Sequence, residues 1–370
     1  MKHLHIVILI FFFFSLRSQV FDNKNTQLVI KKGADHIYNS NKDSAFFYAK
    51  KVERLLPDHP VAPLMRAIAL LWSNIPIITP ALFTEMECQL DSTILLAKKI
   101  DPNLEDPEMI FFTMSAHGLL AEYYADQDQT MKAVGEASRA YGLLKKGFDL
   151  VDEYPEFLFS TGLYNYFIEM YPKKHPIYKP LLWFFRNGDR ELGLQQLETA
   201  AEQSLITKVE AYVYLSYIYL RYEYKPKRAQ VYLLSLCKMY PRNFYAKAKY
   251  LESLANPQDF RNAPIQMIYS MIRHENSYYK LAGYVFLAYF EEVIIKNQEK
   301  AEYAYRKGLE YGEEIPNHGE FFKGFGYLGL GRVLYQKSQK EETEEMLHLA
   351  LEYSETEQIT KEAKELLSKL

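Results

Sequence analysis

The chain contains only two cysteines among its 370 residues, Cys88 and Cys237. They are far apart in the sequence, and we expect them to lie in separate structural units. A disulfide requires the two Cα atoms to lie within about 7 Å of each other. We therefore expect two unpaired, buried thiols. No group of Cys and His has the spacing of metal ligands, so we expect no metal site and no cofactor.

The sequence also lacks a strong charge of either sign. Its formal net charge is -3, and its basic residues are spread along the chain. Proteins that bind nucleic acid usually gather their lysines and arginines on one face or along one helix. We therefore expect no nucleic-acid partner.

The motifs of common enzyme families are missing as well. We find no nucleophile elbow, zinc-protease motif, phosphate-binding loop or dinucleotide fingerprint. The histidines are scattered. His59 and His175 each precede a proline and are interpreted as solvated loop residues, while His117 and His274 fall on expected helices without a partner cysteine or carboxylate pair. We therefore expect that the chain is not an enzyme.

What the sequence does have begins at its N-terminus. Lys2 precedes an unbroken apolar run over residues 6–14, and the small Ser18 lies at a plausible cleavage point. This is the layout of a secretory signal peptide. The run is shorter than the roughly 20 residues that span a bilayer. We predict a signal peptide at 1–18, a folded domain at 19–370, and export to the periplasm or secretion without stable membrane insertion. An uncleaved N-terminal anchor is the alternative.

Small and large apolar residues recur at helical spacing through the rest of the chain. Near the C-terminus one helical face carries a large residue, a leucine, a small residue and a second leucine. A small residue, a leucine and an alanine follow after a break. These residues are Tyr327, Leu330, Gly331, Leu334, Thr343, Leu347 and Ala350. The pattern recurs at 120–140, 213–236 and 285–308, so the sequence predicts a series of similar helical hairpins.

This spacing resembles the tetratricopeptide repeat family, whose unit is a helix-turn-helix of about 34 residues. The resemblance implies an all-α superhelical solenoid of about eight stacked hairpins, because one hairpin cannot bury its apolar face alone. Residues 211–224 have alternating aromatics, but no Gly or Pro interrupts them and they fit the repeat, so we expect a helix there. Residues 243–275 form the weakest repeat. An amphipathic stripe at 357–370 predicts a C-terminal capping helix.

Residues 160–200 depart from the regular repeat. Gly162 and Gly193 hold the small positions of two paired helices, but they are too far apart for an ordinary hairpin, which predicts an insertion near 171–188. We interpret Gly188-Asp189-Arg190 as a helix start with Asp189 as N-cap, and expect Arg190 to pair with a carboxylate. The stretch also resembles a segment of the eukaryotic repeat family linked to the mitochondrial outer membrane and inclusion clearance. That family is intracellular, so its biology is not transferred to this chain. A second apolar insertion is expected near 74–83.

The tetratricopeptide resemblance implies a scaffold that grips a protein or peptide partner on a concave face lined by the first helix of each hairpin. The repeat register places six residues on that face, of the types favoured as interface anchors. They are Tyr166, Tyr214, Arg221, Tyr222, Arg332 and Tyr335. The alternative function is an envelope protein that binds glycans or small ligands through its aromatic surface and its insertions.

Overall fold

The structure is a computed structural model that describes residues 20–174, 176, 185–256 and 258–370. Within these ranges the chain forms seventeen α-helices and no β-strand, so the prediction of an all-α fold is confirmed. The predicted signal peptide at 1–18 lies outside the described residues, as do His175 and residues 177–184 of the predicted insertion at 171–188.

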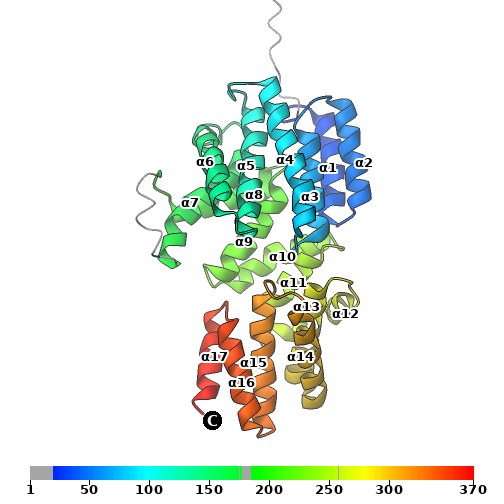
Figure 1. Ribbon diagram of the computed structural model, residues 1–370, viewed down its shortest axis with the longest axis vertical. Coiled ribbons are helices and arrows are strands. Elements are labelled where there is room, and N and C mark those ends of the chain that lie inside the picture. The colour runs from blue at the N-terminus through cyan, green and yellow to red at the C-terminus, as the bar shows by residue number, and fades with distance from the viewer. Residues whose placement is uncertain (1–19, 175, 177–184, 257) are drawn as a thin grey trace, which may run out of the picture.

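The described helices pair in chain order into eight hairpins, followed by a single helix (Figure 1). The single helix, α17 (Glu357–Leu367), packs against α15 and α16 and buries Ile359 and Ala363, which confirms the predicted capping helix. The pairs are α1 (Lys24–Tyr38) with α2 (Lys42–Leu55), α3 (Val61–Asn74) with α4 (Pro80–Ile100), α5 (Pro107–Asp126) with α6 (Thr130–Gly147), α7 (Phe157–Lys174) with α8 (Arg190–Gln203), α9 (Lys208–Arg221) with α10 (Pro226–Met239), α11 (Phe244–Ser253) with α12 (Ile265–Ile272), α13 (Ser277–Phe290) with α14 (Gln298–Glu313), and α15 (Glu320–Gln336) with α16 (Lys340–Glu352).

Five of the hairpins use the same kind of turn between their two helices. One turn residue has a left-handed backbone, and the next residue is the N-cap of the second helix. The left-handed residues are Ser40, Asp128, Tyr224, Lys296 and Ser338. The N–H of that N-cap residue donates to a carbonyl near the end of the first helix, as from Asn41 to His36 at 2.9 Å and from Gln339 to Leu334 at 3.1 Å. This shared turn is structural evidence, independent of side-chain spacing, that the hairpins are repeats of one unit.

The unusual hairpin at 160–200 has the predicted helix start. Asp189 is the N-cap of α8, and its carboxylate accepts a hydrogen bond from the Leu192 N–H at 2.9 Å. Gly162 and Gly193 lie where α7 and α8 touch. A Cβ added at Gly193 would lie 2.6 Å from the Tyr166 backbone nitrogen and 2.8 Å from the Gly162 carbonyl oxygen. The two glycines therefore allow the two backbones to approach closely.

The described ends of the insertion pack on the helical array itself. The Phe185 ring lies 4.9 Å from the Tyr141 ring of α6, and the Arg186 guanidinium lies 4.2 Å from the Phe148 ring. The Tyr164 hydroxyl of α7 donates to the Arg186 carbonyl at 2.6 Å. In the other expected insertion, the loop at 75–79 connects α3 to α4, and the Tyr279 hydroxyl of α13 donates to its Ile75 carbonyl at 2.6 Å.

Buried apolar side chains form two clusters that meet within α11. The first runs from Val20 to Ala246 and the second from Ala248 to Ala363. The hairpin at this boundary has the shortest helices of the eight, with a short 3₁₀ helix (Asp259–Asn262) between them. This is the region that the sequence predicts as the weakest repeat, and the structure shows why: its two helices have fewer turns with which to cover a neighbour.

The array also closes on itself through contacts between residues far apart in the sequence. The Tyr38 hydroxyl of α1 donates to Glu210 of α9 at 2.6 Å, and the Asn39 side chain accepts from the Arg242 N–H at 3.2 Å. The Trp72 ring of α3 lies 6.3 Å from the Tyr245 ring of α11. In an ordinary solenoid each repeat contacts only its neighbours. Here the first two hairpins contact the fifth and sixth.

Candidate functional site on the inner face of the array

One face of α9 contacts the first helices of six other hairpins. Glu210, Tyr214, Tyr217 and Arg221 follow one another at intervals of four, three and four, which places them on one side of the helix. Their contacts, given below, reach α1, α3, α5, α7, α11 and α15. We call the surface on which these first helices face one another the inner face.

At the N-terminal end of α9, the Glu210 carboxylate lies between two of these helices. It accepts hydrogen bonds from the Tyr38 hydroxyl at 2.6 Å and from the Trp72 indole N–H at 3.4 Å. Burial of the carboxyl among these groups raises the pKa of Glu210 to about 7. The two donors favour the ionised form, but the loss of water around the group outweighs them.

Tyr214 lies one turn further along and contacts α5 and α7. Its ring lies 5.5 Å from the Phe159 ring, and its hydroxyl is hydrogen-bonded to the Glu122 carboxyl. The Glu122 side chain has exposed surface, but protein atoms surround it on most sides, and this desolvation, with the nearby Asp126, raises the pKa of Glu122 to about 7. A partly exposed group with protein on most sides is characteristic of a concave surface.

Arg221, at the C-terminal end of α9, is buried and paired with two carboxylates. One guanidinium nitrogen pairs with Glu252 of α11, and another pairs with Glu355, just before α17, at 2.8 Å. Lys249 pairs with Glu252 at 3.0 Å as well. From the sequence we expected Arg221 to lie on the concave face and to be available to a partner carboxylate. In the structure its charge already has internal partners, and its guanidinium lies 5.2 Å from the Phe321 ring of α15.

A cavity of about 320 Å3 lies beside Arg221, between α9, α11, α15 and the first turn of α17. Its apolar walls include Leu220, Phe321 and Phe325, and its polar groups include Arg221 and Glu252. Tyr224, which is 50 % exposed, lies at the edge that the cavity shares with a shallower surface depression. α9, α11 and α15 are first helices of their hairpins, so the cavity belongs to the inner face.

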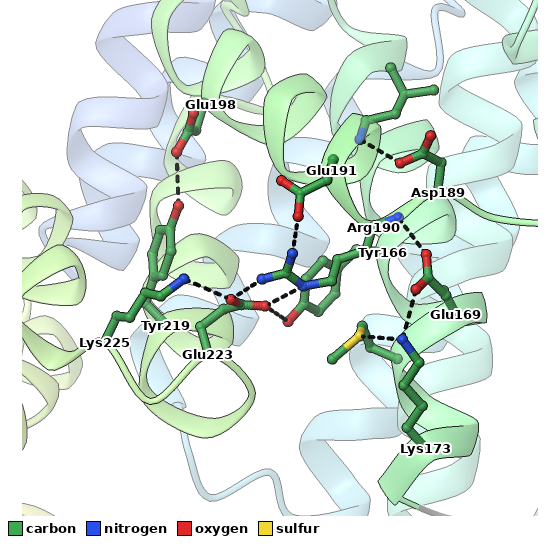
Figure 2. A network of polar contacts seen from close by, with 12 residues as sticks. Tyr166, Glu169, Lys173, Asp189, Arg190, Glu191, Glu198, Tyr219, Glu223 and Lys225 are labelled. Carbon is green, nitrogen blue, oxygen red and sulfur yellow. Dashed lines mark hydrogen bonds and ion pairs between the residues drawn. The ribbon is translucent and has the colours of Figure 1, made fainter.

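Tyr166 and Tyr222 lie together near the other side of the α9 end, 6.0 Å apart between ring centroids, and both are buried. The Tyr166 hydroxyl donates to Glu223 at 2.8 Å, and the same carboxylate accepts two hydrogen bonds from the Arg190 guanidinium (Figure 2). The expected pairing of Arg190 with a carboxylate is confirmed. This network ties the start of α8 to the turn between α9 and α10, which is a structural role.

Arg332 and Tyr335 lie apart from the other four predicted residues, on α15. The Arg332 guanidinium holds Glu292 through two hydrogen bonds, of 2.6 and 2.8 Å, and Glu362 of α17 at 3.0 Å. Tyr335 is 36 % exposed. The structure thus brings Tyr166, Arg221 and Tyr222 together at the end of α9, with Tyr214 on the same inner face, and leaves Arg332 and Tyr335 elsewhere.

The partner carboxylates were missed by sequence reasoning. Glu210 could have been found, because it continues the Tyr214–Arg221 spacing back by one turn. No spacing in the sequence links the other partners to α9, because they come from other parts of the chain and meet α9 only in the folded structure. These partners are Glu122, Glu252 and Glu355.

Two histidines and both cysteines differ from the sequence expectation. His59 is buried rather than solvated and lies 2.7 Å from Glu108, and His117 has a carboxylate partner in Glu136 at 2.5 Å. Both partners come from other helices, which explains why local spacing did not reveal them. Cys88 and Cys237 are unpaired, as expected, but neither is fully buried: Cys88 is exposed and Cys237 is half-buried.

No family model and no curated protein matches the sequence. Solved structures with a similar fold include the human IFIT1 dimer with PPP-AAAA, at 14 % identity over 90 % of this chain and 68 % of that chain, with a TM-score of 0.43. The APC/C hetero-tetramer Cut9-Hcn1 matches at 13 % identity over 91 % and 74 %, with a TM-score of 0.42. The P58(IPK) TPR domain matches at 13 % over 93 % and 99 %, with a TM-score of 0.25. Since these scores are low, the helical-repeat assignment rests on the eight hairpins and their shared turn.

Among residues 20–370, leaving out the gaps given above, no helix combines the length and the apolar character needed to cross a bilayer.

Proposed function

We propose that the chain is an exported helical-repeat scaffold that binds a protein or peptide partner through its inner face. The observation that carries the proposal is the cavity of about 320 Å3 beside Arg221. Binding sites are typically concave, of about 300–1,000 Å3, with apolar and aromatic walls and a few placed polar groups. This cavity has that size and that lining.

The arrangement of the inner face supports this location. On the side of α1, α3 and α5, helix α9 fills the interior of the array, and its Glu210 and Tyr214 contact these helices directly. At the C-terminal end of α9, the helices leave a cavity that opens next to the exposed Tyr224. A partner side chain can enter there without displacing a helix.

Site-specific photo-crosslinking tests the proposal. A photoreactive phenylalanine analogue at Tyr224 reports on the cavity edge, and the same analogue at Tyr303 of α14, which is 68 % exposed, is the matched control. We expect a crosslinked polypeptide at Tyr224 and none at Tyr303 when the protein is expressed in its own host. Equal crosslinking at both positions would be nonspecific and would contradict the proposal. Stabilisation by glycans without any crosslinked polypeptide would favour the glycan-binding alternative.

The export part of the proposal rests on the N-terminal pattern in the sequence, with Lys2, the apolar run and Ser18. N-terminal sequencing of the protein from its host tests it. We expect a mature chain that begins near residue 19 and is found outside the cytoplasm. A chain that retains Met1 in a membrane fraction would instead support the anchor.

A further inference from the structure

The two carboxylates that pair with Arg221 differ in how tightly the fold holds them. The Glu252 side chain is 1 % exposed and has a second cation in Lys249. The Glu355 side chain is 38 % exposed and lies in the segment between α16 and α17. A buried ion pair is costly to break, because it leaves an unpaired charge away from water. A pair in which the carboxylate is partly exposed costs less to break, because that carboxylate can return to water.

The ion pair between Arg221 and Glu355 borders the cavity. Arg221 lines it, and Glu355 lies in the adjoining depression, which shares Tyr224, Thr356 and Glu357 with the cavity. Phe321 and Phe325 of α15 form its apolar wall. A ligand that fills this space with an apolar group therefore comes close to the side of Arg221 that Glu355 occupies.

The other charged groups near Arg221 are already balanced, so a ligand carboxylate has its best position where Glu355 now lies. Glu252 is neutralised by Arg221 and Lys249. In the adjoining depression, Lys361 and Lys364 offset Glu357 and Glu365. The amide N–H groups in the first turn of α17, which also lines the cavity, add positive potential. A ligand carboxylate that takes the place of Glu355, whose side chain then turns to solvent, keeps Arg221 paired, whereas an added cation would meet Arg221 at close range.

We propose that the cavity binds a peptide segment that inserts an apolar side chain and presents an adjacent Asp or Glu carboxylate to Arg221, in place of Glu355. The inference rests on the proposed partner-binding function and adds to it the chemistry of the partner. Glu355 then acts as an internal competitor that occupies the arginine until an acidic segment arrives.

Two labelled peptide pools test this chemistry by fluorescence polarisation. In one pool Phe or Leu is followed by Glu, and in the other by Gln, with the same neutral flanking residues. We expect the Glu pool to bind at least about fivefold more tightly than the Gln pool. Glu355→Gln removes the competitor and should tighten binding of the Glu pool by up to about fivefold. Glu357→Gln makes the same change in net charge without freeing Arg221, and should have a smaller effect.

Removal of Arg221 could unfold the chain, so a second variant tests the cavity itself. Ala255 lines the cavity and is partly exposed, so Ala255→Leu should fill space and weaken binding of the Glu pool by tenfold or more while thermal unfolding is preserved. Ala137→Leu, on the exposed side of α6, is the control.

Equal binding of both pools, or equal effects of Glu355→Gln and Glu357→Gln, would overturn the inference. If neither pool binds while crosslinking at Tyr224 still captures a polypeptide, the partner has another chemistry: the inference fails and the proposed function stands. If the crosslink is also missing, both fail.

Discussion

Gly193 has no room for even one more carbon atom. A Cβ there would lie within 3.0 Å of three backbone atoms of α7, and backbone cannot move aside as a side chain can. Sequence reasoning alone favours Gly193→Ala, because alanine is the better helix former by about 1 kcal/mol. The structure reverses that expectation. We predict that Gly193→Ala lowers the free energy of unfolding by about 1–3 kcal/mol, the usual cost of overpacking.

Gly142 provides the matched control for this prediction. It lies in the middle of α6, is exposed, and has nothing within 4 Å of an added Cβ. Gly142→Ala should raise the free energy of unfolding by up to about 1 kcal/mol. Denaturant unfolding of both variants measures the difference. Similar effects of the two substitutions would mean that α7 and α8 are not in close contact.

Glu210 should make stability depend on pH. Its pKa in the folded chain is about 7, raised mainly by burial, against about 4.3 in an unfolded chain. The folded state therefore binds the proton more tightly. This contribution to stability is complete below about pH 4 and is lost as the pH rises through about 7.

The prediction concerns the difference between wild type and Glu210→Gln. As the pH rises from 5 to 8, the free energy of unfolding of the wild type should fall relative to the variant, by about 1–3 kcal/mol. Taking the difference removes the titration of His117 and of other shared groups. Parallel curves for the two proteins would show that Glu210 is ionised and well solvated in the folded chain.

At the scale of single elements, one side chain, Asp189, caps the N-terminus of α8 and stabilises it. The Asp189 carboxylate accepts the Leu192 N–H, and the next residue, Arg190, joins the network around Glu223 (Figure 2). Asp189→Ala should lower the free energy of unfolding by about 0.5–2 kcal/mol, and Asp189→Ser should restore most of it, because serine can also cap. Chemical denaturation checks both. A loss of equal size in both variants would point to the charge of Asp189 rather than to its cap.

The elements that could be predicted from the sequence are those with a local signal. The periodic apolar faces gave the hairpins, Asp189 gave the start of α8, and the stripe at 357–370 gave the capping helix. The register also placed Tyr214 and Arg221 on one face of α9. What these two side chains contact could not be predicted, because Glu122, Glu252 and Glu355 reach them from other hairpins. Repeat spacing predicts on which side of a helix a residue lies, but it does not predict which distant hairpins that side will contact.

At the scale of the whole molecule, the contacts between α9 and the first two hairpins should hold these distant parts of the chain together. Tyr38→Phe together with Trp72→Phe removes both hydrogen-bond donors to Glu210. We expect faster amide hydrogen exchange in α1, α3 and α9, and little change in α15 and α16, whose buried side chains belong to the other apolar cluster.

Hydrogen-exchange mass spectrometry measures this effect, with Tyr303→Phe on the exposed side of α14 as control. Faster exchange throughout the chain would show that the two clusters unfold as one unit. Unchanged exchange in α1 and α3 would show that neighbouring helices alone hold the first hairpins.

The contacts that hold α9 against the first two hairpins limit how the number of hairpins in this chain can change. Repeat arrays commonly tolerate the gain or loss of a whole unit, since each unit needs only its neighbours. Here one more hairpin between α3 and α9 would move Glu210 away from Tyr38 and Trp72 by about one helix spacing, 8–10 Å. Duplication or deletion of a unit between α3 and α9 therefore breaks distant contacts as well as local ones. The number of hairpins between α3 and α9 is therefore fixed by these contacts, and gain or loss of a unit there should not be tolerated.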